Sequence, residues 1–248
     1  MTRDEIMVSR DYLVCKSNKL IQDTRYDLSA QQQKIILFLA SKIKPEDKDF
    51  EEYEFNLDDI CDIFGIQKQT ENFKVLRDNI VALHNKPFWI EDGDKEILCS
   101  WITKAIIDKK KQKVMIQLDK DLKPLLLQLS ENYTNYELAN VLALDGKYTI
   151  RFYELLRSYK NLREITIPLS KLRKQFDCEN KYNDFKDFKK RVIVPAIEEI
   201  NKYTNITVSV EYIKYKKVVV ELLFYIKDKK GDENLQMLLE RERKLENE

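Results

Sequence analysis

Apolar positions in the second half of the chain follow two periodicities. In residues 206–212 and again in 218–226, apolar side chains alternate with polar ones, which is the period of a half-buried strand. Tyr215, Lys216 and Lys217 join these strands. Over residues 183–203 the apolar side chains recur at three- and four-residue spacings, so they share one helical face: Phe185, Phe188, Val192, Ala196, Ile200 and Tyr203. The pattern predicts a long helix followed by a two-stranded hairpin.

The rest of the chain predicts a further series of short elements. Helices are expected at about 30–43, 58–64, 73–84, 136–144, 149–159 and 170–176. Strands are expected at 53–56, 88–90, 97–107, 114–118 and 165–167, with those at 88–90 and 97–107 forming a hairpin and 109–113 forming a basic turn. A last charged helix at 234–245 has no obvious partner in the sequence.

The two halves repeat each other at a constant offset of 112 residues. Phe55 corresponds to Ile167, Phe64 to Phe176, and Phe73-Lys74 to Phe185-Lys186. The same register pairs Arg77 with Lys189 and Ile80 with Val192, so apolar positions stay apolar and basic positions stay basic. An ungapped register of this length indicates a tandem duplication.

The order of elements in each copy predicts the fold. Helix, short strand, short helix, longer helix and hairpin is the order of a winged helix, a helix-turn-helix variant with a β wing. We therefore expect an α+β protein with two tandem winged-helix domains, at 14–130 and 134–228, followed by a charged tail at 231–248. The third helix of such a domain is the one expected to enter a DNA major groove.

Composition argues against an enzyme. With one histidine, His84, the chain cannot build a two-histidine metal site, and with 4 glycines it cannot build a glycine-rich phosphate loop. The 4 cysteines form no Cys-x-x-Cys pair, so we expect reduced thiols and no metal. No segment has the length of a membrane span or the pattern of a signal peptide. The expectation is a cytoplasmic, non-enzymatic protein without cofactor or membrane partner.

Charge is distributed unevenly along the chain. Residues 1–133 have a net charge of −3, residues 134–230 of +7, and residues 231–248 of −3. Such asymmetry favours nucleic-acid contact by the second half, although uneven solvated charge is the simple alternative. In the long helix, cations lie in the first turns, where they oppose the helix dipole, so an external polyanion explains them best. The alternative is that Asp184 and Asp187 neutralise them locally.

The candidate DNA-binding residues are all polar or basic. In the second copy they lie at the start of the long helix, off its apolar face, and at the tip of the hairpin; in the first copy they occupy the matching helix. They are Asn183, Lys186, Lys189, Lys190, Arg191, Lys214, Lys216, Lys217, Lys74 and Arg77. Lysines at the hairpin tip and at 109–111 could instead serve solubility, an alternative that is stronger for 109–111.

Several segments resemble the Rep family of plasmid replication initiators. There are four such segments, and their first residues are Lys16-Ser-Asn-Lys-Leu-Ile, Tyr26-Asp-Leu-Ser-Ala-Gln-Gln-Gln, Tyr148-Thr-Ile-Arg-Phe-Tyr-Glu-Leu-Leu and Phe185-Lys-Asp-Phe-Lys-Lys-Arg-Val-Ile-Val-Pro-Ala. The resemblance implies two winged-helix domains that bind direct repeats (iterons) of double-stranded DNA at a plasmid origin. It also implies host initiator and helicase proteins as partners, and a homodimer, in equilibrium with the monomer, that represses its own promoter. The triplet Lys189-Lys190-Arg191 matches the family's basic triplet.

Two other functions remain possible at this point. A tandem winged-helix transcriptional regulator would share every feature except the resemblance. A nicking initiator with a catalytic tyrosine among the 13 Tyr would be an enzyme, which the single His84 disfavours.

Overall fold

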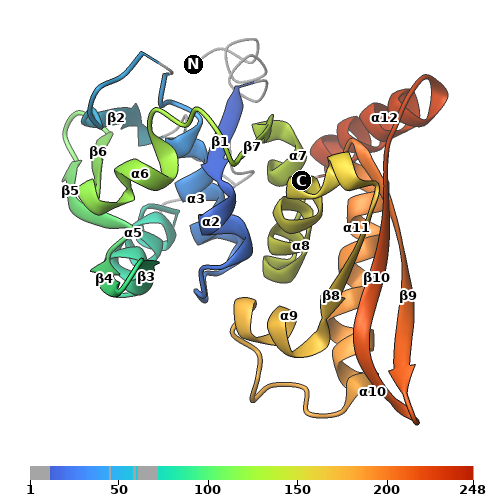
Figure 1. Cartoon of the computed structure of the whole chain (residues 1–248). Coiled ribbons are helices and arrows are strands. Elements are labelled where there is room, and N and C mark those ends of the chain that lie inside the picture. Colours follow the sequence, from blue (N-terminus) through green and yellow to red (C-terminus); the bar gives the residue numbers. More distant parts are fainter. Residues whose placement is uncertain (1–11, 45, 58–59, 61–71, 248) are drawn as a thin grey trace. The chain divides into compact units, whose positions relative to one another are not determined.

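The computed structural model describes residues 12–44, 46–57, 60 and 72–247 (Figure 1). The chain divides into two compact units. The first contains residues up to 20 and 31–142, and the second contains residues 21–30 and 143–247. The predicted short helix at 58–64 lies outside the described residues, except for Ile60.

Among the described residues, the first unit combines three small sheets with short helices. β2 (Tyr53–Asn56), β6 (Lys113–Leu118) and β5 (Ile102–Asp108) form an antiparallel sheet in the order β2-β6-β5. β1 (Leu13–Ser17) pairs with β7 (Tyr133–Glu137), and β3 (Phe88–Asp92) pairs with β4 (Lys95–Cys99). The helices that the structure describes here are α2 (Asn18–Gln22), α3 (Ala30–Ala40), α5 (Asn72–His84), the 3-10 turn Lys120–Leu122, α6 (Lys123–Leu126) and α7 (Leu138–Leu142). The last two residues of α2 and the first residue of α3 belong to the second unit.

Two sequence predictions for this unit were wrong. The predicted strand at 97–107 is two strands, because Trp101 and Ile102 are both buried and break the alternation, and the Ser100 amide donates to Asp119 Oδ2 at 3.0 Å. The wing of this unit is therefore β5–β6, with β3–β4 as an additional hairpin. The predicted helix at 136–144 begins only at Leu138, because residues 133–137 pair with β1.

The second unit has the element order of a winged helix. α8 (Lys147–Ser158) is followed by the 3-10 turn Lys160–Leu162, β8 (Glu164–Pro168) and α9 (Leu169–Gln175). Phe185–Tyr203, which we call the recognition helix, consists of α10 (Phe185–Phe188), the π-helical turn Lys189–Ile193 and α11 (Val194–Tyr203). β9 (Ile206–Tyr215) and β10 (Val218–Asp228) form the wing, and α12 (Asp232–Asn247) ends the unit.

The sheet orders of the two units correspond. β8-β10-β9 repeats β2-β6-β5, with the first strand next to the last in both. The core of the second unit lies between this sheet and the helices, where Phe152 contacts Phe176 and Phe224 at ring-centroid distances of 4.7 and 5.9 Å. The buried residues of the wing are Ile206 and Val208 on β9 and Val219, Leu222, Phe224 and Ile226 on β10.

Residues 21–30 pack on the second unit, although the chain on both sides of them belongs to the first. The buried Arg151 of α8 donates to the carbonyls of Thr24 at 3.0 Å and Gln175 at 3.2 Å, and its guanidinium lies 3.7 Å from the centre of the Tyr26 ring. We call residues 21–30 the strap. The strap and the β1–β7 pairing make the unit boundaries differ from the predicted 14–130 and 134–228.

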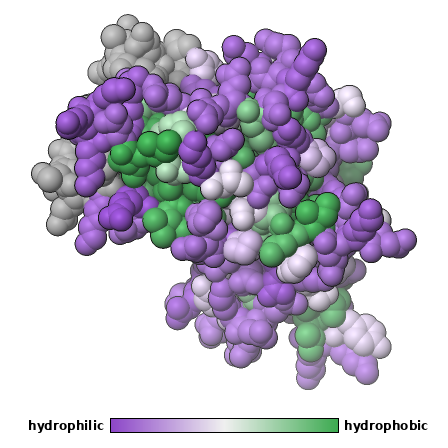
Figure 2. All heavy atoms as spheres, turned by 90° about the vertical axis from the view of Figure 1, so that its left-hand side faces the viewer, coloured by the Kyte–Doolittle hydropathy of each residue, from purple (hydrophilic) through white to green (hydrophobic). Residues whose placement is uncertain are grey.

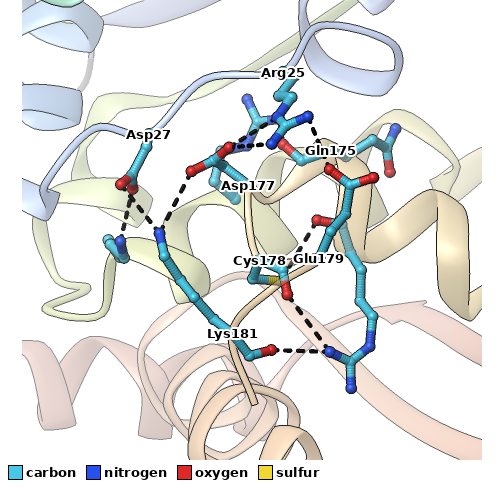
Figure 3. Close-up of polar contacts among 10 residues, drawn as sticks. Arg25, Asp27, Gln175, Asp177, Cys178, Glu179 and Lys181 are labelled. Atoms are coloured by element: carbon cyan, nitrogen blue, oxygen red, sulfur yellow. Dashed lines mark hydrogen bonds and ion pairs between the residues drawn. The ribbon is translucent and has the colours of Figure 1, made fainter. Parts of the chain in front are cut away.

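Ion pairs fix the strap to the start of α8 and to the turn after α9 (Figure 3). Arg25 contacts Asp177 at 2.7 Å and Glu179 at 2.8 Å, and Asp27 contacts Lys147 at 2.7 Å and Lys181 at 3.5 Å. Burial by itself would raise the pKa of Asp27, but the hydrogen bond from Lys147 and the two lysine charges hold it below its usual value.

Candidate nucleic-acid interface

The recognition helix packs on the second unit by the face that its sequence predicts. Phe188, Val192, Ala196 and Ile200 are buried, and Ile193 is buried with them. Phe185 and Tyr203, at the two ends, are half-buried. Because this face holds the helix, the opposite face is directed to solvent.

The basic triplet forms a π-helical turn. The amide of Val194 donates to the carbonyl of Lys189, five residues back. Pro195 explains the wider turn: proline has no N–H to donate, and its ring clashes with the carbonyl four residues earlier, here that of Arg191. Single π turns inside helices are frequent at functional sites. The widened turn presents Lys190 and Arg191 while Val192 and Ile193 stay buried.

The outward cations of the recognition helix are not neutralised by their neighbours. Lys186, Lys190 and Arg191 are exposed. Within the part of the chain that the structure describes, no ion pair joins them to Asp184 or Asp187. Local neutralisation is therefore not observed, and positive charge at the start of the helix is left available to an external anion.

Lys189 lies differently from the other candidates. Its Nζ is 4.4 Å from the centre of the Tyr212 ring on β9, and Phe185 meets the same ring edge-on at 5.4 Å. Lys189 is half-buried by these contacts. Its charge therefore joins the recognition helix to the wing, a role that helical spacing alone does not reveal because the partner lies 23 residues further along the chain.

The wing ends in a two-residue lysine turn. Tyr215 pairs with Val218, so Lys216 and Lys217 form the turn, and Lys216 has a φ of 58°. β8 pairs with β10 only as far as Glu221, so the end of the wing extends beyond the third strand. Lys214, Lys216 and Lys217 are exposed there, beside an exposed Tyr215 and Val218. The end of the wing lies at the bottom of Figure 2, which shows apolar and polar side chains mixed there.

Arg173 supports the start of the recognition helix, and the sequence pattern gave no sign of this role. Its guanidinium lies 4.4 Å from the centre of the Phe188 ring and donates to the carbonyls of Lys181 at 2.9 Å and Tyr182 at 2.8 Å. These contacts fix the turn that ends at the exposed Asn183. Asn183 therefore lies directly before the first turn of the helix, as the sequence places it.

The first unit presents a weaker version of the same surface. Lys74 and Arg77 are exposed on α5, opposite the buried Leu76, Ile80 and Leu83. Asp78 and Asn79 stand where the second copy has Lys190 and Arg191, and Asn79 is hydrogen-bonded to Gln31 Oε1 at 3.0 Å.

The basic turn at 109–112 is the tip of the first unit's wing. The carboxylate of Asp108 accepts from the amides of Lys110 at 3.0 Å and Lys111 at 2.9 Å, which shapes the turn between β5 and β6. Lys109, Lys110 and Lys111 are exposed. Their position matches that of the lysine turn in the second unit, a correspondence that the extra hairpin conceals in the sequence.

Other chemistry-bearing groups occupy structural positions. His84 Nδ1 lies 3.2 Å from the Ile102 carbonyl. Burial raises the pKa of Cys99 to about 12 and that of Cys178 to about 11. Over the described residues, His, Cys, Asp and Glu side chains do not gather into a possible metal site, and no helix has the length and apolar character needed to cross a membrane.

Comparisons with known proteins agree with this arrangement. Two family models match, described as Initiator Replication protein, WH1, over residues 13–157 and Initiator Rep protein, WH2, over residues 168–226. A replication initiation protein of Escherichia coli is 24% identical over 213 residues, which cover 81% of this chain and 66% of that protein, slightly under two thirds.

A solved structure has the same fold. The crystal structure of domains 2 and 3 of RctB superposes with a TM-score of 0.52 at 13% identity and covers 84% of this chain and 86% of that one. The WH1 match alone spans more than half of the chain, and the WH2 match covers the basic triplet and the wing. The chain therefore belongs to the Rep family of plasmid replication initiators, DNA-binding proteins with two tandem winged-helix domains.

Proposed function

We propose that this chain initiates plasmid replication by binding direct repeats of double-stranded DNA at the origin. The second domain supplies most of the affinity, and the first supplies an auxiliary DNA contact and the dimer interface. Host initiator and helicase proteins are recruited to the complex and supply the catalysis, so the chain itself acts without enzymatic activity or cofactor. A dimer, in equilibrium with the monomer, represses the chain's own promoter.

The observation that carries this proposal is the outward face of the recognition helix. Lys186, Lys190 and Arg191 are exposed and take part in no ion pair within the described residues. The contacts of Tyr212 with Phe185 and Lys189 join β9, the strand that leads to the lysine turn, to the first turns of the recognition helix. A helix in the major groove with a basic hairpin beside it can contact base edges and phosphates together.

The roles of the ten candidate residues follow from their positions. Lys190 and Arg191 are proposed to contact base edges, because an arginine fork suits the O6 and N7 atoms of guanine. The exposed wing lysines and Lys186 are proposed to contact phosphates, as are Lys74 and Arg77 in the first domain. Asn183 is proposed to contact the backbone beside the helix, and Lys189 to position the wing.

A replication assay tests the proposal. A plasmid whose only origin consists of the repeats adjacent to the gene should be maintained when the wild-type chain is supplied, and lost with Lys190→Ala/Arg191→Ala. Lys227→Ala/Lys230→Ala is the matched control, because it also removes two exposed cations of the same domain, and both lie outside the recognition helix and the lysine turn. Repeat binding without plasmid maintenance would favour the transcriptional regulator, and nicking of supercoiled DNA with Mg²⁺ would favour an enzyme.

A further inference from the structure

α12 is attached to the second domain by one face. Met237 is only 4% exposed, Arg241 Nε donates to the Tyr203 carbonyl at 2.6 Å, and Lys244 Nζ contacts the Ala143 carbonyl at 2.8 Å and Asp145 at 2.6 Å. Glu240 contacts Lys202 of α11 at 3.2 Å. The helix therefore has a partner, which corrects the expectation from its sequence, and its attachment uses two of its three cations.

The opposite face of α12 combines leucines with carboxylates. Leu235, Leu238 and Leu239 are 55%, 44% and 36% exposed, and their spacing places them on one stripe. Asp232 and Glu242 are exposed on the same side of the helix and form no ion pair within the described residues. The remaining cation, Arg243, contacts Glu240. The outer face is thus apolar at its centre, and its border carries Asp232, Glu242 and the Arg243–Glu240 pair, which together are net acidic.

The leucines of this stripe contribute only part of their surface to holding the helix, since 36–55% of each is exposed. Met237 and the polar contacts of Arg241 and Lys244 already attach it to the domain, and each exposed leucine leaves apolar surface in water at a cost of about 25 cal/mol per Å². Three such leucines on one stripe are typical of a helix that binds in a partner's groove.

Charge determines the kind of partner. Carboxylates beside the leucines repel DNA, RNA and anionic membrane surfaces, which the basic end of the same domain would attract. They favour a protein surface that carries lysine or arginine. We propose that the outer face of α12 docks into an apolar groove of another protein, bordered by basic side chains.

The position of α12 makes this binding compatible with DNA. The helix packs at Tyr203, the last residue of the recognition helix, whereas the cations lie in its first turns and the lysine turn lies at the far end of the wing (Figure 1). α12 also lies beyond residue 226, where the WH2 match ends. The inference rests on this surface and not on DNA binding. The docking of α12 and the proposed function at the origin can therefore fail separately.

Photo-crosslinking in the full-length chain tests the inference. A benzoylphenylalanine at Leu238 should crosslink in host cells to a protein other than this chain, whereas the same group at Leu162, an exposed leucine outside α12, should not. The crosslinked protein is then purified, and its affinity is measured for the wild type, for Leu235→Ser/Leu238→Ser/Leu239→Ser and for Glu242→Lys. We expect at least a tenfold loss with the serine variant and at least a threefold loss with the lysine variant.

Unchanged melting temperature and unchanged affinity for origin DNA show that both variants are folded. Leu162→Ser should bind the partner as the wild type does. Any of four results would overturn the inference. Leu238 could crosslink only to a second copy of this chain, or to nothing. The serine variant could bind the partner with the affinity of the wild type, or Glu242→Lys could bind it more tightly than the wild type does.

Discussion

At the scale of single residues, exposure separates side chains that can contact DNA from those that organise the domain. Lys190 and Arg191 are adjacent in the chain and exposed. Lys189 precedes them but contacts Tyr212, and Arg173 is equally basic but holds the turn before the helix through Phe188 and two carbonyls. We therefore predict DNA contacts for exposed cations that form no ion pair within the described residues, and positioning roles for Lys189 and Arg173.

Arg191→Ala tests direct base contact. We expect a loss of about 1–3 kcal/mol in binding to the repeat and relaxed specificity at one base pair, because a bidentate contact to guanine is removed. Lys217→Ala should weaken binding to repeat and random DNA alike, because Lys217 is proposed to contact the DNA backbone, which is the same in every sequence. Fluorescence anisotropy measures the affinity of each variant for repeat and for random DNA. The comparison requires that each variant keeps the melting temperature of the wild type. If Arg191→Ala loses equal affinity for repeat and random DNA, Arg191 contacts phosphate and not a base edge.

At the scale of elements, two contacts decide how the interface is held. The ring of Tyr212 joins the wing to the first turns of the recognition helix, and the ion pairs of Asp27 and Arg25 join the strap to the turn after α9. Both connect elements that are distant in sequence. One substitution removes the Tyr212 ring, and another removes the ion pairs of Asp27; both leave Lys186, Lys190 and Arg191 in place.

Tyr212→Ala should weaken repeat binding although Tyr212 itself need not touch DNA. An aromatic pair contributes about 0.5–1.5 kcal/mol and a cation–π contact about 0.5–1 kcal/mol, so we expect roughly a fivefold loss of affinity as the wing loses its fixed position. Tyr212→Phe keeps the ring and should bind within about twofold of wild type. Equal binding by Tyr212→Ala would show that the wing does not depend on this contact.

Asp27→Asn should change the dependence of stability on pH. The pKa of Asp27 is lowered in the folded chain, so its ion pairs stabilise the fold above the unfolded pKa, near 3.8, and this contribution is lost as pH falls through the folded value. Wild type should therefore exceed Asp27→Asn in melting temperature at pH 7, and the difference should shrink below about pH 4. A constant difference from pH 7 to pH 3 would contradict the assignment.

At the scale of the whole molecule, two domains with the same strand order carry unequal charge. The second domain has exposed cations in both the recognition helix and the wing. The first has Lys74 and Arg77 on α5 and the lysine turn 109–111, but Asp78 and Asn79 occupy the positions of Lys190 and Arg191. We expect binding of the whole chain to release counterions, with log K falling by about 0.9 per phosphate contact for each unit of log salt concentration.

Inserting 5 bp in the middle of the repeat tests whether both domains contact DNA. If their third helices enter successive major grooves, about 10.5 bp apart, the insertion rotates one half of the site to the opposite face of the duplex. High-affinity binding by the monomer should be lost, leaving the weaker contact of the second domain, and a footprint of about two turns should shorten. Undiminished binding would assign the first domain to dimerisation or partner docking alone.

Local sequence determined much of this protein. Three- and four-residue spacing identified the buried face of the recognition helix, alternation identified the wing, and the 112-residue repeat predicted two related domains. These patterns are readable because helix and strand periods relate residues that are close in the chain. The same spacing placed Lys186, Lys190 and Arg191 outside the buried face, and in the structure all three are exposed.

Contacts between distant segments were decided only by the tertiary structure. The strap packs on the second unit through Arg151, more than 120 residues away, and β1 pairs with a strand at 133–137, which shortens the helix predicted there. Lys189 and Arg173 contact Tyr212 and Phe188, and α12 packs on its domain through Met237 while Leu235, Leu238 and Leu239 stay exposed. No local period encodes such pairings, because they depend on which surfaces meet when the elements pack.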